Sequence, residues 1–271
     1  MQRGTGDRLA LCLHGFPEHA ISWRHQLPVL ESLGYRAWAP NQRGYGNTTR
    51  PTRVADYGLD RLMADVAALI DASGARSTVL IAHDWGAFVA WCFAARRLRP
   101  LDALIILNVP HPQRYLLSLR HWRQLRKSWY VLLFQLPWLP EYLFRRRGGR
   151  ALRDLFVATG GDPRNFPDDV LEVYRTPALA PGALTAMLNW YRAAARGGLL
   201  REVWRGLPTI DVPTLMIWGA RDVALDIVTT RGTGRHVRDL SLHVLPEASH
   251  WVQQDAPEAV NALIADFLGK R

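Results

Sequence analysis

The hydrophobic positions of this chain follow two alternating patterns. Short apolar runs, typical of strands buried on both faces of a parallel sheet, alternate with helical segments in which apolar residues recur every three or four positions. Such alternation of strands and helices predicts an α/β protein with a doubly wound, mostly parallel sheet. The runs lie at residues 9–13, 35–39, 77–82, 101–107, 214–218 and 240–245, and the helical segments at residues 22–33, 59–73, 86–97 and 257–268.

The pattern changes between residues 112 and 207. Apolar residues there keep a helical spacing without strand-like alternation, and prolines at positions 137, 140, 163, 167, 177 and 181 divide the segment into short pieces. Strand-like runs resume at residue 214. We therefore expect residues 1–111 and 208–271 to form one α/β core, into which residues 112–207 are inserted as a helical cap.

The most informative transition follows the run at residues 77–82. The segment from Ala82 to Gly86 joins this run to the next helix, so Asp84 is expected at the carboxyl end of a central strand, where open α/β sheets bind ligands. The frame Ala82-x-Asp84-x-Gly86 resembles the nucleophile elbow G-x-S-x-G of the α/β-hydrolase fold. Alanine replaces the first glycine of that motif, and aspartate replaces the serine.

An aspartate at this position implies a particular chemistry. A carboxylate with a reference pKa of about 3.9 is anionic at neutral pH and needs no base to attack. It suits displacement at a saturated carbon that carries a departing oxygen or halogen, and the product of that step is an alkyl ester on Asp84. Hydrolysis of the ester requires a histidine that activates water, and backbone N–H donors for the oxyanion.

Two further residues follow later strands and complete a triad. Asp222 comes after the run at residues 214–218, and His250 after the run at residues 240–245. The order Asp84, Asp222, His250 is the nucleophile, acid, histidine order of the fold, and Asp222 is expected to fix the tautomer of His250. The competing candidates are Asp226 and Asn108 for the acid, although an amide cannot supply negative charge, and His83, His111 and His243 for the base.

Residues 14–17, with the sequence HGFP, resemble the oxyanion loop of the epoxide hydrolase family. The resemblance implies that the backbone N–H groups of Phe16 and Trp85 form the oxyanion hole, and that His14 shapes the loop. Trp85 and Trp251, which directly follow the nucleophile and the histidine in sequence, are expected to contact the substrate.

The helical insertion carries two more segments of this resemblance. Residues 129–137 resemble the cap segment around the first tyrosine of epoxide hydrolases, and residues 189–192 resemble the segment around the second. The resemblance implies that Tyr130 and Tyr191 donate hydrogen bonds and a proton to the departing oxygen. The alternative is that both rings only pack the cap.

Together these features predict an epoxide hydrolase that converts a small apolar epoxide and water into a vicinal diol without a cofactor. A haloalkane or haloacid dehalogenase with the same nucleophile is the alternative enzyme, but Phe16 stands where haloalkane dehalogenases carry a halide-binding asparagine. A third possibility is a hydrolase-fold protein that binds a ligand without turnover. The sequence contains no metal-ligand spacing, dinucleotide fingerprint or phosphate loop.

Charge and composition narrow the range of partners. The formal net charge is +10, but the arginines are scattered apart from one dense patch at residues 145–150, so we interpret them as a solvated surface and not as a nucleic-acid site. No apolar run reaches the roughly 18 residues that span a bilayer, which favours a cytoplasmic protein without integral membrane association. Cys12 and Cys92 lie in apolar segments and are expected to be buried thiols.

The amino-terminal segment is short for this fold. Only thirteen residues precede His14, which leaves no room for the strand hairpin that related hydrolases carry there. We expect the first two strands of the fold to be missing and residues 35–39 to become a sheet edge, whose unpaired backbone groups favour association, for example as a homodimer. The accompanying hypothesis is that a longer in-frame product is the native form.

Overall fold

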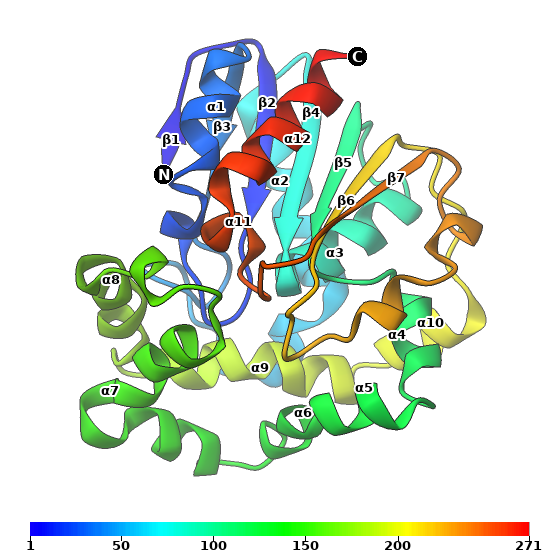
Figure 1. Ribbon diagram of the computed structural model, residues 1–271. Coiled ribbons are helices and arrows are strands. Elements are labelled where there is room, and N and C mark those ends of the chain that lie inside the picture. The colour runs from blue at the N-terminus through cyan, green and yellow to red at the C-terminus, as the bar shows by residue number, and fades with distance from the viewer. Residues whose placement is uncertain (271) are drawn as a thin grey trace.

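Seven strands form one sheet in the computed structural model, which describes residues 1–270 (Figure 1). The strand order is β1-β3-β2-β4-β5-β6-β7, and all neighbours are parallel except β1 and β3. The predicted α/β-hydrolase architecture is therefore confirmed. The strands are β1 (Gln2–Arg3), β2 (Arg8–Leu13), β3 (Tyr35–Trp38), β4 (Ser77–His83), β5 (Ala103–Leu107), β6 (Thr214–Gly219) and β7 (Leu240–Leu245).

Helices cover both faces of this sheet. One face packs against α1 (Gln26–Ser32) and α12 (Pro257–Gly269), and the other against α2 (Leu59–Ser73) and α3 (Asp84–Ala95). Because successive side chains of a strand point to opposite faces, each central strand supplies both cores. Cys12 and Cys92 are buried free thiols, as predicted. The shorter elements of the core are 3-10 helices at Ala20–Trp23, Val54–Tyr57, Ile227–Thr230 and Thr233–Arg235, and α11 (Val252–Asp255).

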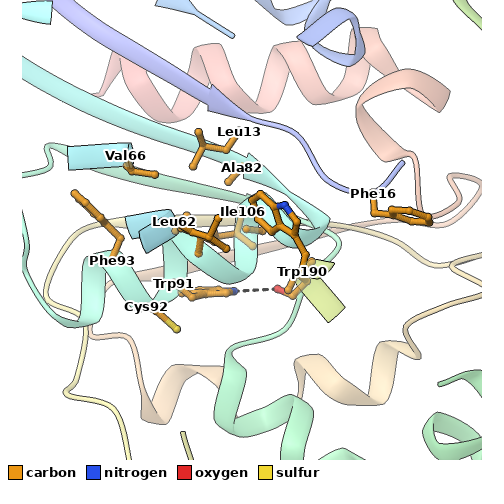
Figure 2. Close-up of a cluster of buried hydrophobic side chains, with 14 of the residues drawn as sticks. Leu13, Phe16, Leu62, Val66, Ala82, Trp91, Cys92, Phe93, Ile106 and Trp190 are labelled. Carbon is orange, nitrogen blue, oxygen red and sulfur yellow. Dashed lines mark hydrogen bonds between the residues drawn. The ribbon is translucent and has the colours of Figure 1, made fainter. Parts of the chain in front are cut away.

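The core beside α3 is anchored by Trp91. Its ring is fully buried together with Phe93, Leu62 and Ile106 (Figure 2), and complete burial of one large apolar side chain stabilises a fold by about 1.5–3 kcal/mol. The indole N–H of Trp91 donates to the backbone carbonyl of Val109 at 3.1 Å. This bond ties α3 to the turn after β5, from which the helical insertion departs.

Seven helices lie between β5 and β6 in sequence and extend across the carboxyl ends of the strands (Figure 1). The indole of Trp190 connects this layer to the core, since its N–H donates to the carbonyl of Arg43 at 3.0 Å. Within residues 1–270, no helix combines the length and apolar character needed to cross a membrane. The helices are α4 (Pro112–Ser118), α5 (Trp122–Lys127), α6 (Trp129–Leu133), α7 (Leu139–Thr159, interrupted by non-helical residues 146–149), α8 (Asp168–Ala178), α9 (Ala183–Arg196) and α10 (Leu199–Arg205), with a 3-10 turn at Pro163–Asn165.

The prediction that β3 is an open edge was wrong. The two residues of β1 pair antiparallel with it, Gln2 opposite Trp38 and Arg3 opposite Ala37. The Met1 carbonyl also accepts the N–H of Ala39 at 2.9 Å. A two-residue strand is too short to show a sequence pattern, which is why it escaped notice. Its presence removes the reason for association through β3.

Candidate active site

Asp84 stands at the sharp turn between β4 and α3. Its φ is +48°, a left-handed conformation that is uncommon outside glycine and is held by surrounding structure. A Cβ on Gly86 would lie 2.5 Å from the carbonyl oxygen of Leu13, so only glycine allows the strand and helix to approach this closely. The methyl group of Ala82, where the motif has glycine, is accommodated in the core. The elbow therefore forms despite that departure.

The oxyanion loop touches the Asp84 carboxylate directly. The backbone N–H of Phe16 donates to Asp84 Oδ1 at 2.6 Å. His14 shapes the loop, as the resemblance implied: its Nε2 accepts the N–H of Gln42 at 3.1 Å, which leaves Nδ1 to donate to the Gly15 carbonyl at 3.0 Å. Burial lowers the pKa of His14 to about 4, so the ring is neutral.

Gly15 provides a sharp test of this contact. A Cβ at residue 15 would lie 2.2 Å from Asp84 Cβ and Oδ1, so Gly15→Ala must displace the carboxylate. We expect kcat/KM to fall about 100-fold or more, because misplacement by one ångström costs about that much, and stability to fall by about 1–3 kcal/mol. Steady-state kinetics and urea unfolding measure both effects. Gly234→Ala is the matched control, because its Cβ would meet nothing within 4 Å; equal losses in both variants would contradict the prediction.

The predicted triad residues lie together at the carboxyl edge of the sheet. His250 Nδ1 donates to Asp222 Oδ2 at 2.7 Å, and its Nε2 lies 3.6 Å from Asp84 Oδ2. The other oxygen of Asp222 accepts the N–H groups of Ala224 and Leu225 at 2.7 and 2.8 Å. His250 is thus held between two carboxylates, with one ring nitrogen facing each.

The position of His250 between two carboxylates determines the protonation states of the site. Burial alone would lower the pKa of His250, but the charges and hydrogen bonds of Asp222 and Asp84 outweigh it and raise that pKa to about 10. Burial likewise opposes ionisation of both carboxyls, yet His250 holds the pKa of each below its usual value. The free site therefore carries two carboxylates and one imidazolium at neutral pH.

The competing candidates have other partners. Asp226 caps a 3-10 turn through the N–H of Val228 at 3.0 Å and lies 3.6 Å from the amine of Lys127. Asn108 is not the acid but supports it: its Nδ2 donates to Asp222 Oδ2 at 2.8 Å. Asn108 therefore lies beside the triad at the carboxyl ends of the strands. Its hydrogen bond to the acid was not predicted from the sequence.

A buried pair behind the triad was also missed. His83 and Glu18 are both fully buried, and His83 Nδ1 lies 2.7 Å from the Glu18 carboxylate. His83 Nε2 donates to the backbone carbonyl of His250 at 2.8 Å. Glu18 also accepts the side-chain amides of Gln253 and Gln254 at 2.9 and 2.8 Å. This network fixes the backbone that carries His250.

The two tyrosines of the helical insertion face Asp84 across an apolar space. Two cavities, of about 320 and 470 Å³, have Asp84, Tyr130 and Tyr191 in common among their lining residues. Burial raises the pKa of both phenols well above the ordinary value, so both are neutral donors at neutral pH. Both tyrosines therefore lie beside the cavities that Asp84 lines.

The two tryptophans occupy different positions around this space. Trp85 lines the smaller cavity, and its ring centroid lies 4.9 Å from that of Tyr191. Trp85 also belongs to the first turn of α3, whose N–H groups have no acceptor within the helix. Trp251 lines the larger cavity, and its indole N–H donates to the hydroxyl of Thr159 on α7 at 2.9 Å. Within residues 1–270, no cluster of histidine, cysteine and carboxylate side chains could hold a metal ion.

A parallel sheet with a nucleophile elbow, a strand-end acid and a late histidine defines an α/β hydrolase. The chain belongs to the alpha/beta hydrolase fold family, whose profile matches residues 11–257. It is 38% identical over 273 residues to Epoxide hydrolase 4 of Homo sapiens, covering 97% of this chain and 73% of that protein. It is 37% identical over 262 residues to the AB hydrolase superfamily protein YfhM of Bacillus subtilis (strain 168), covering 96% and 90%.

Solved structures of epoxide hydrolases also resemble this chain. The crystal structure of a Bacillus megaterium epoxide hydrolase in complex with an inhibitor matches with a TM-score of 0.89 and 30% identity, covering 99% of this chain and 95% of that chain. The resemblance to epoxide hydrolases indicated by the sequence motifs is thereby confirmed.

Proposed function

We propose that this protein is an epoxide hydrolase that converts a small apolar epoxide into a vicinal diol through an ester on Asp84. The observation that carries the proposal is that Asp84, Tyr130 and Tyr191 together line both cavities. The epoxide hydrolases among its relatives support the same activity. We further propose residues 112–207 as the cap domain, because they supply both tyrosines.

In the first step, a carboxylate oxygen of Asp84 attacks an epoxide carbon. Oδ1 is held by the N–H of Phe16, so Oδ2 is the oxygen that forms the new C–O bond. The epoxide C–O bond breaks, and the departing oxygen takes a proton from Tyr130 or Tyr191, whose phenolate is then reprotonated through solvent. Neutral phenols suit this task because they can both orient the oxygen and donate to it.

In the second step, water cleaves the ester. Esterification removes the negative charge of Asp84, one of the two charges that raise the pKa of His250, so His250 gives its proton to the solvent, which reprotonates the phenolate, and becomes a base. A water molecule then gives a proton to His250, and the resulting hydroxide attacks the carbonyl carbon of the ester. Oδ1 carries the charge of the tetrahedral intermediate, and the N–H groups of Phe16 and Trp85 stabilise it. Collapse releases the diol and restores Asp84.

Isotope labelling and a substrate panel test the proposal. One turnover in oxygen-18 water should place the label in Asp84 and not in the diol, because water attacks the ester carbon. Label that appears directly in the diol would exclude the covalent route. Styrene oxide, a terminal alkyl epoxide, 1-bromobutane and a p-nitrophenyl ester together separate an epoxide hydrolase from a dehalogenase, an esterase and an inert binding protein.

The tyrosines also distinguish the two enzyme classes. Tyr130→Phe and Tyr191→Phe should each lower kcat on an epoxide about 100-fold, since general-acid groups contribute at least about that much. A halide leaves without a proton, so any turnover of 1-bromobutane should be unaffected. Tyr142→Phe is the matched control, because that ring is 56% exposed. Full activity of the double variant on epoxides would show that the rings only pack the cap.

A further inference from the structure

An apolar stripe runs along the outer side of α5 and α6. It consists of Trp122, Leu125, Trp129, Leu132 and Leu136, which follow one another at steps of three and four residues. Their exposed fractions are 65%, 59%, 63%, 74% and 45%. Trp122 and Leu125 lie on α5, Trp129 and Leu132 on α6, and Leu136 just beyond α6, and the spacing within each helix together with the shared exposure places them on the outer side of this segment. We call these five residues the outer stripe.

The inner side of the same segment already has partners. Gln124, Ser128 and Phe134 are buried, and Gln124 donates to the carbonyl of Ala224 at 3.1 Å. The segment is therefore docked on the protein by its inner side, while the outer stripe faces solvent. Figure 1 shows α5 and α6 at the periphery of the molecule, with α9 between them and the sheet. Contiguous large apolar side chains on a surface mark an interaction site.

The charge around the outer stripe is strongly positive. Residues 120–150 contain seven arginines and one lysine but only one carboxylate, Glu141. Lys127 is paired with Asp226 at 3.6 Å and Arg150 with Asp154 at 3.4 Å, so the positive charge comes from the other six arginines. Glu141 is itself paired with Arg192 at 2.7 Å. Two arginines lie over exposed aromatic rings: Arg126 lies 5.4 Å from the ring of Trp122, and Arg146 lies 5.6 Å from that of Tyr142. A partner that fits this surface therefore combines apolar groups with negatively charged groups.

We propose that the outer stripe docks on the surface of a bilayer that contains anionic lipids. Tryptophan and leucine enter the boundary between headgroups and acyl chains, while arginines beside them pair with lipid phosphates. A second copy of this chain would bring the same positive charge to the contact, which opposes self-association. The attachment is peripheral and needs no membrane-spanning helix.

Docking on a bilayer would also bring the two cavities close to lipid-dissolved substrates. This inference rests on the proposed function. Trp129 lines the larger cavity and Leu132 lines the smaller one, so both cavities extend to the outer stripe. An apolar epoxide dissolved in the lipid could pass from the bilayer to Asp84 without crossing bulk water. Soluble substrates would still enter from solvent.

Vesicle flotation of the full chain without substrate tests docking independently of the enzymatic proposal. The protein should float with vesicles of phosphatidylcholine and phosphatidylglycerol and remain free with phosphatidylcholine alone. Trp122→Ser with Leu125→Ser should lower the bound fraction about tenfold or more. Neither residue lines either of the two cavities beside Asp84, so hydrolysis of a water-soluble epoxide should be unchanged. The matched control is Leu242→Ser with Val244→Ser, whose side chains on β7 are each 40% exposed.

A second variant tests the contribution of the arginines to vesicle binding. Arg123→Gln with Arg126→Gln should shift binding to lower salt concentrations while leaving the circular dichroism spectrum unchanged. Absence of binding to anionic vesicles at low salt would overturn the proposal, as would wild-type binding by the Trp122 and Leu125 variant. A dimer in size-exclusion chromatography that this variant converts to a monomer would assign the outer stripe to a second copy instead.

Discussion

Asp84→Asn should reduce kcat on any epoxide by at least about 10⁴-fold, because the amide cannot replace the carboxylate as nucleophile. Asparagine is the informative substitution. It keeps the volume of the side chain, can accept the N–H of Phe16, and tolerates the left-handed backbone that residue 84 adopts. Steady-state assays and thermal unfolding should show an inactive protein that remains folded.

The variant also removes one of the two charges that flank His250. We therefore expect the pKa of His250 to fall in Asp84→Asn from the value of about 10 in the wild type, which an NMR titration of the ring can follow. Turnover at the wild-type rate would eliminate the ester mechanism. An unchanged His250 pKa would mean that the two side chains do not interact across their 3.6 Å separation.

His250→Gln should stop the reaction after the first step. Asp84 can still open the epoxide, but no base activates water, so steady-state turnover should fall about 10³- to 10⁴-fold. The enzyme should release diol only at this residual rate and should gain the mass of one substrate molecule. Intact-protein mass spectrometry after mixing with epoxide measures this directly, and a peptide digest should place the adduct on Asp84.

Asp222→Asn is the companion variant. It should accumulate the same adduct, and the adduct should be hydrolysed more slowly than in the wild type but faster than in His250→Gln, because the histidine remains but loses the carboxylate that orients its ring at 2.7 Å. A His250→Gln enzyme with no adduct and no activity would indicate that the histidine is needed for epoxide opening. Normal turnover would place the base elsewhere.

The positions of the triad residues could be predicted because each one follows a strand that is recognisable from its own sequence. Asp84, Asp222 and His250 each follow a strand, and the carboxyl ends of parallel strands meet at one edge. The helical insertion could be recognised for a similar reason, since its change in periodicity is visible over many residues. Six of the seven strands and the principal helices of the core were predicted from the same signal, with boundaries within a few residues.

Other features depend on contacts between distant segments. Glu18 is buried because residues 83, 253 and 254 converge on it, and nothing in the local sequence indicates that convergence. The supporting bond from Asn108 to Asp222 likewise joins residues 114 positions apart. The outer stripe has a helical period that predicts a helix, but the period cannot show that the apolar side faces outward.

Trp251 has a consequence for the timing of the catalytic cycle. It adjoins His250 in the chain, and its indole is fastened to the hydroxyl of Thr159 on α7. If α7 swings outward to let the diol escape, it must either release that tryptophan or drag the histidine's loop with it. Because the Trp251 ring also packs on Phe156 of α7 at 4.6 Å, an outward movement of that helix would act directly on the loop that carries the catalytic histidine.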